Sequence, residues 1–208
     1  MTAGTYEEFF DELGFEESSD NYQADNNLGY IGRYQLGKLA LIDLGYYTDD
    51  GDLGGSVFVD ANFTGLNGIS SRQDFLDNET VQDSAVMELA RRNWNQLRFN
   101  DVEFYAGQTL NGVQLSVTGL LGAAHLVGAQ AVADWLKAGG TDALTDGNGT
   151  PATEYIQLFF DYEFPATFPT NFELGNPVNG GSGNDALRGF EGADTLNGRD
   201  GSSARFCQ

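Results

Sequence analysis

A nine-residue repeat near the C-terminus limits most strongly what this chain can fold into. Residues 180–188 read GGSGNDALR and match the pattern G-G-x-G-x-D-x-U-x in full, where U is a large apolar residue. Residues 189–197 read GFEGADTLN and depart only at the second glycine, and a third unit loses the pattern at Ser203. Glycines at this spacing allow tight turns with inward carbonyls, while Leu187 and Leu196 stack as a narrow apolar core. A flexible linker is the alternative, but it does not require three elements to recur at one period.

The repeat resembles the calcium-binding nonapeptide repeats of the RTX, or hemolysin-type, family. Ca²⁺ prefers a shell of six to eight oxygen ligands, which aspartates and turn carbonyls provide. The resemblance implies a Ca²⁺ site formed by Gly181, Gly183, Asp185, Gly192 and Asp194. It also implies a secreted, extracellular protein that leaves the cell through a type I exporter. The chain departs from the family in having barely two and a half repeats, where roughly three are usually needed for a continuous core.

Composition excludes several classes of partner and fold. The formal net charge of -21 argues against binding nucleic acid or an anionic membrane, which both favour Lys and Arg. Hydrophobic residues make up 40% of the chain, so a packed core can form despite this charge. Polar residues interrupt the most apolar stretch, 115–136, which is typical of a buried helix rather than a membrane span. Cys207 is the single cysteine, so an internal disulfide is excluded.

Helical patterns dominate the larger part of the chain. In the first helix Thr5 and Glu8 have the spacing of a capping box, and Gly14 is expected to end it with a turn. Further helices are predicted over 34–44, after the cap Ser71, over 80–99 with Thr80 as its cap, over 117–136 with a break at Gly128, and after Thr150 with Pro151 as the first helical residue. Strand-like alternation is weak and confined to 56–59.

These signals predict a mainly α protein with four parts. A helical domain is expected over 1–163, and a linker containing three of the four prolines over 164–179. The calcium-binding repeats follow over 180–201 as a short β-roll-type tail, and 202–208 is expected to be disordered. The first residues lack the basic start and apolar stretch of a cleaved signal peptide, which agrees with export by another route.

The segment 17–35, ESSDNYQADNNLGYIGRYQ, contains the candidate catalytic motif. It resembles the first motif of lytic transglycosylases and goose-type lysozymes, E-S-x5-A-x-S-x-x-G-A-x-G-L-M-Q. Aligned from Glu17 without a gap, the chain keeps Ser18, Ala24, Gly29, Gly32 and Gln35. It departs where Asn26 replaces Ser, Tyr30 replaces Ala, and Arg33 and Tyr34 replace Leu-Met.

The resemblance implies a lysozyme-like domain that cleaves bacterial cell-wall peptidoglycan with Glu17 as its general acid. Such an acid must be held protonated by an apolar setting until it protonates the glycosidic oxygen. Phe15, Tyr22 and Tyr30 are the side chains expected to provide that setting. The alternative is a solvated glutamate beside Glu16 at an acidic helix end, as most exposed carboxylates are.

Two later segments resemble the same family in the expected order. Residues 123–128, AAHLVG, resemble A-Y-N-A-G, with His125 at the aromatic position and Leu126 at the Asn. Tyr155 resembles the tyrosine that hydrogen-bonds the catalytic glutamate. The residues expected to bind substrate are therefore Tyr30, Tyr34, Gln35, His125 and Tyr155. A lone histidine on an apolar helix is otherwise a buried core residue.

The reaction type stays open at the level of the sequence. Leu126 in place of Asn allows a transglycosylase, a hydrolase or an inactive relative, and Asp43, Asp49, Asp50 and Asp52 are equally placed as a second carboxylate. The competing function is a non-catalytic secreted protein that binds a glycan or a partner in a calcium-dependent way. Residues 146–150, DGNGT, are interpreted as a turn rather than a calcium loop, because Gln157 stands where an acidic ligand would be required.

Overall fold

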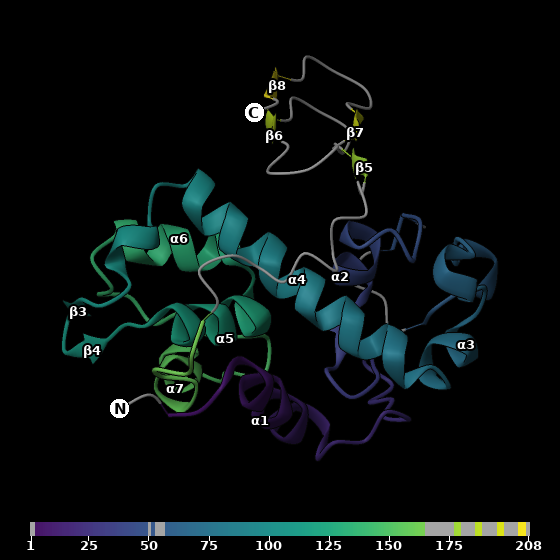
Figure 1. The fold of residues 1–208 in the computed structure, drawn as a ribbon, viewed down its shortest axis with the longest axis horizontal. Helices are drawn as coiled ribbons and strands as arrows, with labels where there is room; N and C mark the ends of the chain where they lie inside the picture. The colour runs from purple at the N-terminus through teal and green to yellow at the C-terminus, as the bar shows by residue number, and fades with distance from the viewer. Residues whose placement is uncertain are drawn as a thin grey trace. The chain divides into compact units, whose positions relative to one another are not determined.

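The structure is a computed structural model that describes residues 3–49, 51–52 and 57–164, together with four short strands nearer the C-terminus. It divides into two units, 1–164 and 165–208. The described part of the first unit is mainly helical, as predicted (Figure 1). Its α-helices are α1 (Tyr6–Ser18), α2 (Lys38–Asp43), α3 (Arg72–Leu76), α4 (Glu79–Phe99), α5 (Val117–Val127), α6 (Ala129–Lys137) and α7 (Ala152–Leu158). Among the described helices, none is long and apolar enough to cross a membrane.

Helix α1 begins as the sequence predicts but continues further. The Thr5 side chain accepts a hydrogen bond from the Glu8 backbone, and the Glu8 side chain accepts one from the Thr5 backbone, which completes the capping box. Phe9 and Leu13 bury its apolar face. The turn predicted at Gly14 is wrong, because Gly14 lies inside the helix. A Cβ there would lie 2.4 Å from Arg33 Nε, so this glycine makes room for a side chain rather than for a turn.

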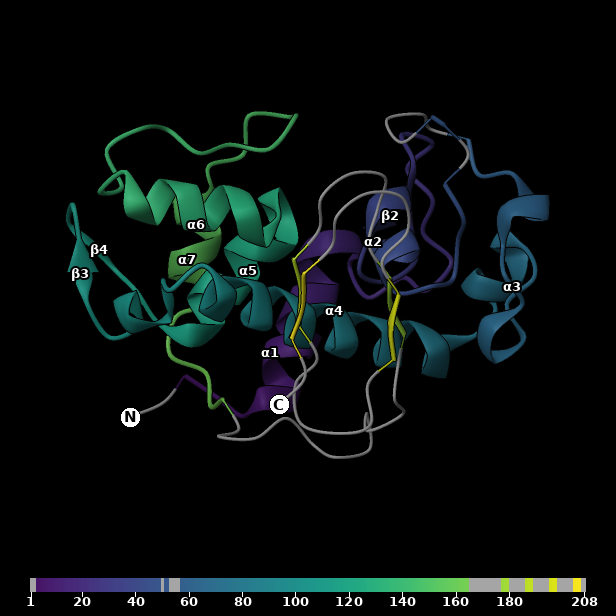
Figure 2. The same ribbon diagram turned by 90° about the horizontal axis from the view of Figure 1, so that it is seen from above.

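Helix α4 runs through the middle of the first unit (Figures 1 and 2). It contacts α3 near one end and both α5 and α6 toward the other end. It begins at Glu79 because the Asn78 side chain caps it by accepting a hydrogen bond from Val81, so the predicted cap at Thr80 is wrong. The core between α4, α5, α6 and α7 includes five buried residues: Leu97, Leu120, Val132, Leu136 and Ile156.

Helices α5 and α6 are separated at Gly128, as predicted, where φ is +85°. Helix α7 begins at Ala152, one residue later than expected, with Pro151 as its N-cap. Helices α5 and α7 approach closely because α5 carries glycines on the facing side. A Cβ on Gly119 would lie 2.6 Å from the Ile156 carbonyl oxygen of α7.

The predicted helix over 34–44 is wrong in its first turn. Strand β1 (Tyr30–Ile31) pairs antiparallel with β2 (Leu36–Gly37), and only Lys38–Asp43 is helical. Between the two strands, residues 32–35 form a turn in which the Gln35 backbone donates to the Gly32 carbonyl at 3.1 Å. Residues 34–37 therefore belong to the turn and to β2, and not to the helix that their apolar pattern predicted.

The remaining short elements were predicted less well. Ser71 caps α3 as expected, by accepting a hydrogen bond from Asp74. Residues 57–59 form no strand, and Ser56 lies outside the described residues. The sequence did not predict the hairpin of β3 (Thr109–Leu110) with β4 (Val113–Gln114). It also did not predict three 3₁₀ turns, which are η1 (Asp60–Asn62), η2 (Leu66–Gly68) and η3 (Glu103–Tyr105).

In the second unit the described residues form two parallel strand pairs. Strand β5 (Pro177–Asn179) pairs with β7 (Thr195–Asn197), and β6 (Ala186–Arg188) pairs with β8 (Ala204–Phe206). Each residue pairs with the one two nine-residue units away, as Leu187 does with Arg205. Strand β5 falls in the segment predicted as a linker and β8 in the segment predicted as disordered. The predicted Ca²⁺ ligands Gly181, Gly183, Asp185, Gly192 and Asp194 lie outside the described residues.

Candidate functional site

Glu17 lies at the end of α1 and points toward α7. Its side chain is 14% exposed, and its Oε1 accepts a hydrogen bond of 2.9 Å from the hydroxyl of Tyr155. These two residues are 138 positions apart in the chain. The structure therefore brings together the two residues that the motif resemblance had paired.

The Tyr155 hydroxyl is a permanent donor to this carboxylate. Burial and then the negative charge of Glu17 raise the pKa of Tyr155 above its usual range. The hydroxyl keeps its proton across the physiological pH range and holds one oxygen of Glu17 in a fixed direction.

His125 faces the same carboxylate from α5. Its Nε2 lies 2.9 Å from the backbone oxygen of Tyr34 and 3.7 Å from Glu17 Oε1, and its side chain is 8% exposed. A carbonyl oxygen can only accept a hydrogen bond, so Nε2 carries the proton and the neutral ring is the Nε2–H tautomer. His125 is thus a hydrogen-bonded and largely buried histidine, and it is also a neighbour of Glu17.

The 32–35 turn contacts both sides of this group through its backbone. The carbonyl of Arg33 accepts a 2.8 Å hydrogen bond from the hydroxyl of Ser18, the residue after Glu17. The next carbonyl, that of Tyr34, is the acceptor for His125. Within the turn Gln35 has φ +45°, and its side-chain amide donates to the Gly32 carbonyl. Gln35 therefore stabilises the turn itself.

The other predicted side chains lie elsewhere. Tyr30 is 49% exposed on β1, with its ring against Gly37, and Phe15 is 57% exposed. The hydroxyl of Tyr22 donates to Asp83 on α4. The groups found beside Glu17 are instead the Tyr155 hydroxyl and Nε2 of His125, which are polar, whereas Phe15, Tyr22 and Tyr30 were expected to provide an apolar setting.

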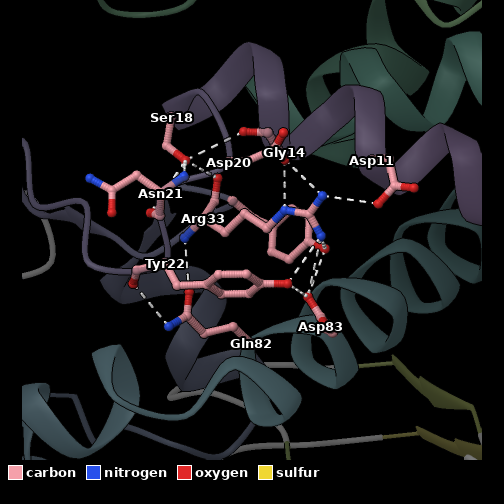
Figure 3. A network of polar contacts seen from close by, with 10 residues as sticks. Asp11, Gly14, Ser18, Asp20, Asn21, Tyr22, Arg33, Gln82 and Asp83 are labelled. Atoms are coloured by element: carbon pink, nitrogen blue, oxygen red, sulfur yellow. Dashed lines mark hydrogen bonds and ion pairs between the residues drawn. The ribbon is translucent and has the colours of Figure 1, made fainter.

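A buried arginine organises the neighbourhood of the turn, and its role was missed at the level of the sequence (Figure 3). The Arg33 guanidinium makes five hydrogen bonds, with Asp11, Asp20 (two bonds), Tyr22 and Tyr34 as acceptors. The hydroxyls of Tyr22 and Tyr34 both donate onward to Asp83. The available signal was the departure from the motif, since Arg33 and Tyr34 stand where the family has Leu-Met.

The backbone of Arg33 is also fixed by a hydrogen bond to a buried side chain. Its N–H donates to the side-chain oxygen of Gln82, which is 2.8 Å away and buried on α4. The Gln82 amide nitrogen in turn donates to the carbonyls of Tyr22, Phe75 and Leu76. Gly32 has φ +80°, and a Cβ there would lie 2.2 Å from the Gln82 oxygen. Only glycine fits at this position of the turn.

Three further aspartates that the sequence singled out have partners of their own within the first unit. Within the described ranges no group of three or more His, Cys, Asp and Glu side chains is arranged to hold a metal ion. Asp146 accepts hydrogen bonds from the backbones of Asn148 and Thr150, so residues 146–150 form the predicted turn. Of the aspartates considered as a second carboxylate, Asp49 accepts from the Gly51 backbone and Asp52 pairs with Lys38.

Comparison with known proteins leaves this geometry as the basis for assigning a function. No family model, no curated protein and no solved structure matches the chain.

Proposed function

We propose that the first unit cleaves glycans of the bacterial cell wall, with Glu17 as the general acid. The observation that carries this proposal is the 2.9 Å hydrogen bond from Tyr155 to a largely buried Glu17. The motif resemblance predicts that these two residues form a hydrogen bond. They are 138 positions apart in the chain, so the bond depends on the tertiary structure and not on a local sequence pattern. A mainly helical unit is also what a lysozyme-like domain requires.

The proposed chemistry uses one carboxyl group twice. Glu17 gives its proton to the glycosidic oxygen as the bond from the sugar carbon to that oxygen breaks. The resulting carboxylate then takes a proton from the attacking hydroxyl, which belongs either to the same sugar or to water. Tyr155 keeps its proton throughout and orients Glu17 Oε1, while His125, whose Nε2–H donates to the Tyr34 carbonyl, lies 3.7 Å from the same oxygen.

Purified full-length protein should release soluble fragments from peptidoglycan. Products with anhydro-sugar ends would identify attack by the internal hydroxyl, and products with reducing ends would identify hydrolysis. Chromatography with mass spectrometry distinguishes the two. No release from a substrate that a known lysozyme digests in parallel would contradict the proposed activity.

Replacing Tyr155 with phenylalanine should lower kcat by about 10- to 100-fold. The variant keeps the ring but removes the hydroxyl that orients Glu17, and small misplacements of reacting groups cost rates of this order. Steady-state kinetics on a soluble glycan measure the effect. Tyr46→Phe is a matched control, because Tyr46 is also buried and loses one hydrogen bond, to Asn67. An equal loss of activity in both variants would contradict a specific role for Tyr155.

We also propose that the second unit binds Ca²⁺ and marks the protein for secretion through a type I exporter. Parallel pairing of strands two repeat units apart supports this, because a coil of stacked nonapeptide turns requires that register. The proposal concerns the tail alone, since the helices of the first unit have their own caps and apolar faces.

Calcium should change the tail and leave the first unit intact. Circular dichroism of the full-length protein should respond to added Ca²⁺ and reverse with a chelator, because ligand binding to the folded form stabilises it. The double variant Asp185→Ala with Asp194→Ala should lose this response, since it removes the carboxylate ligands. Identical calcium responses in the variant and the wild type would remove these two residues from the proposed site.

A further inference from the structure

We propose that Arg33 is a positioning residue whose guanidinium holds the 32–35 turn so that the turn's two carbonyls fix Glu17 and His125. The inference concerns the same site and rests on the proposed function for its kinetic part. Its structural part, the orientation of His125, is independent of any activity.

Two backbone carbonyls of the turn contact the surroundings of Glu17. Consecutive carbonyls of the turn, from Arg33 and Tyr34, accept the hydroxyl of Ser18 at 2.8 Å and Nε2 of His125 at 2.9 Å. Ser18 adjoins Glu17 at the end of α1, and His125 lies on α5. One two-residue segment therefore contacts both the end of the helix that carries Glu17 and the histidine that lies beside its carboxylate.

The Arg33 side chain clamps that segment to its surroundings. Three elements surround the Arg33 guanidinium: α1 through Asp11, the following loop through Asp20 and Tyr22, and α4 through Asp83, which lies 3.6 Å from Nη1. A planar guanidinium with five N–H donors can satisfy all of these partners at once, whereas an ammonium cannot. The side chain thus ties the turn to both helices at fixed angles.

Loss of the Arg33 guanidinium removes one of the hydrogen bonds that hold the Tyr34 side chain. The hydroxyl of Tyr34 accepts a hydrogen bond from Arg33 at 2.8 Å and donates one to Asp83 at 2.8 Å. These two bonds fix the position of the hydroxyl and so of the ring. A cavity of about 130 Å³ adjoins it. Its lining residues are Glu7, Phe10, Asp11, Arg33, Tyr34, Asp83 and Met87. Without the guanidinium this cavity becomes larger, so the Tyr34 ring gains room to move. We expect the backbone of Tyr34 to shift with the ring, and the Tyr34 carbonyl then no longer holds the His125 ring.

The test uses the fact that His125 is the only histidine in the chain. Nitrogen-15 NMR of the full-length protein reports its two ring nitrogens without ambiguity. In the wild type at a pH where the ring is neutral, Nε2 should give the signal of a protonated nitrogen and Nδ1 that of an unprotonated one. Arg33→Met should give averaged signals for both nitrogens, because the Tyr34 carbonyl no longer selects one tautomer.

Kinetics give the second readout. Arg33→Met should lower kcat on the glycan substrate by about 10- to 100-fold with KM changed less than about twofold, because misplaced reacting groups lose rate rather than binding. Arg33→Lys should restore only part of the rate, since it keeps the charge without the planar set of donors. Tyr34→Phe removes only the hydroxyl and tests the same link if Arg33→Met does not fold.

The matched control is Arg91→Met. Arg91 makes two 2.7 Å hydrogen bonds to Glu88 on α4, so its loss also breaks a charged pair, away from the turn. It should leave the His125 signals unchanged. Wild-type signals in folded Arg33→Met, or in folded Tyr34→Phe, would overturn the proposal. If wild-type protein cleaves no glycan, the proposed function fails, and the NMR comparison still decides the role of Arg33.

Discussion

Glu17→Gln should reduce glycan cleavage by about 10²- to 10⁴-fold, which is the usual contribution of a general acid. Glutamine has the same shape as glutamate, and its side-chain oxygen can still accept the hydrogen bond from Tyr155. It has no acidic proton to give to the glycosidic oxygen. The variant should therefore fold and melt like the wild type while losing kcat.

The control for Glu17→Gln is the neighbouring residue. Glu16 is exposed on the same helix, so Glu16→Gln removes one negative charge without removing the carboxyl that Tyr155 holds. It should keep activity within about twofold, since exposed charges act weakly through water. Retained cleavage by Glu17→Gln would contradict the assignment of the acid. Glycan binding by the wild type without any turnover would favour the non-catalytic binding protein instead.

Gly119→Ala should destabilise the first unit by about 2–3 kcal/mol, in the range of overpacked cores. The added Cβ would lie 2.6 Å from the Ile156 carbonyl oxygen, which is backbone and cannot rotate away. Helices α5 and α7 must therefore move apart. Because α5 carries His125 and α7 carries Tyr155, the same change should also lower kcat.

Thermal unfolding and kinetics measure the two effects of Gly119→Ala together. A loss of this size lowers Tm by roughly 5–10 °C in a domain of this length. Gly147→Ala is the control, because Gly147 is exposed and a Cβ there meets nothing within 4 Å. A wild-type Tm in Gly119→Ala would show that the contact between the two helices is not rigid.

Local signals in the sequence were reliable where the structure they specify spans one or two helical turns. The capping box at Thr5, the cap at Ser71 and the break at Gly128 all occur as predicted. Each depends on hydrogen bonds between residues three or four positions apart, or on a backbone angle that glycine adopts easily. At the start of α4 the observed N-cap is Asn78, whereas the sequence predicted Thr80.

Local signals failed where a distant part of the chain decides the conformation. Gly14 could equally end a helix or make space for a neighbour, and only the position of Arg33 selects the second. The apolar spacing over 34–44 fits a helix, yet pairing of β1 with β2 removes its first turn. In both cases a long-range contact outweighs a weak local preference.

The candidate site divides in the same way. By itself the sequence determined the motif around Glu17, the helices that carry His125 and Tyr155, and the nine-residue period of the tail. Only the tertiary structure decided that Tyr155 holds Glu17, and that the Tyr34 carbonyl fixes the His125 tautomer. The physical reason is that these hydrogen bonds join residues 91 and 138 positions apart. Their geometry depends on the packing of α1, α5 and α7 around the 32–35 turn, which no local pattern encodes.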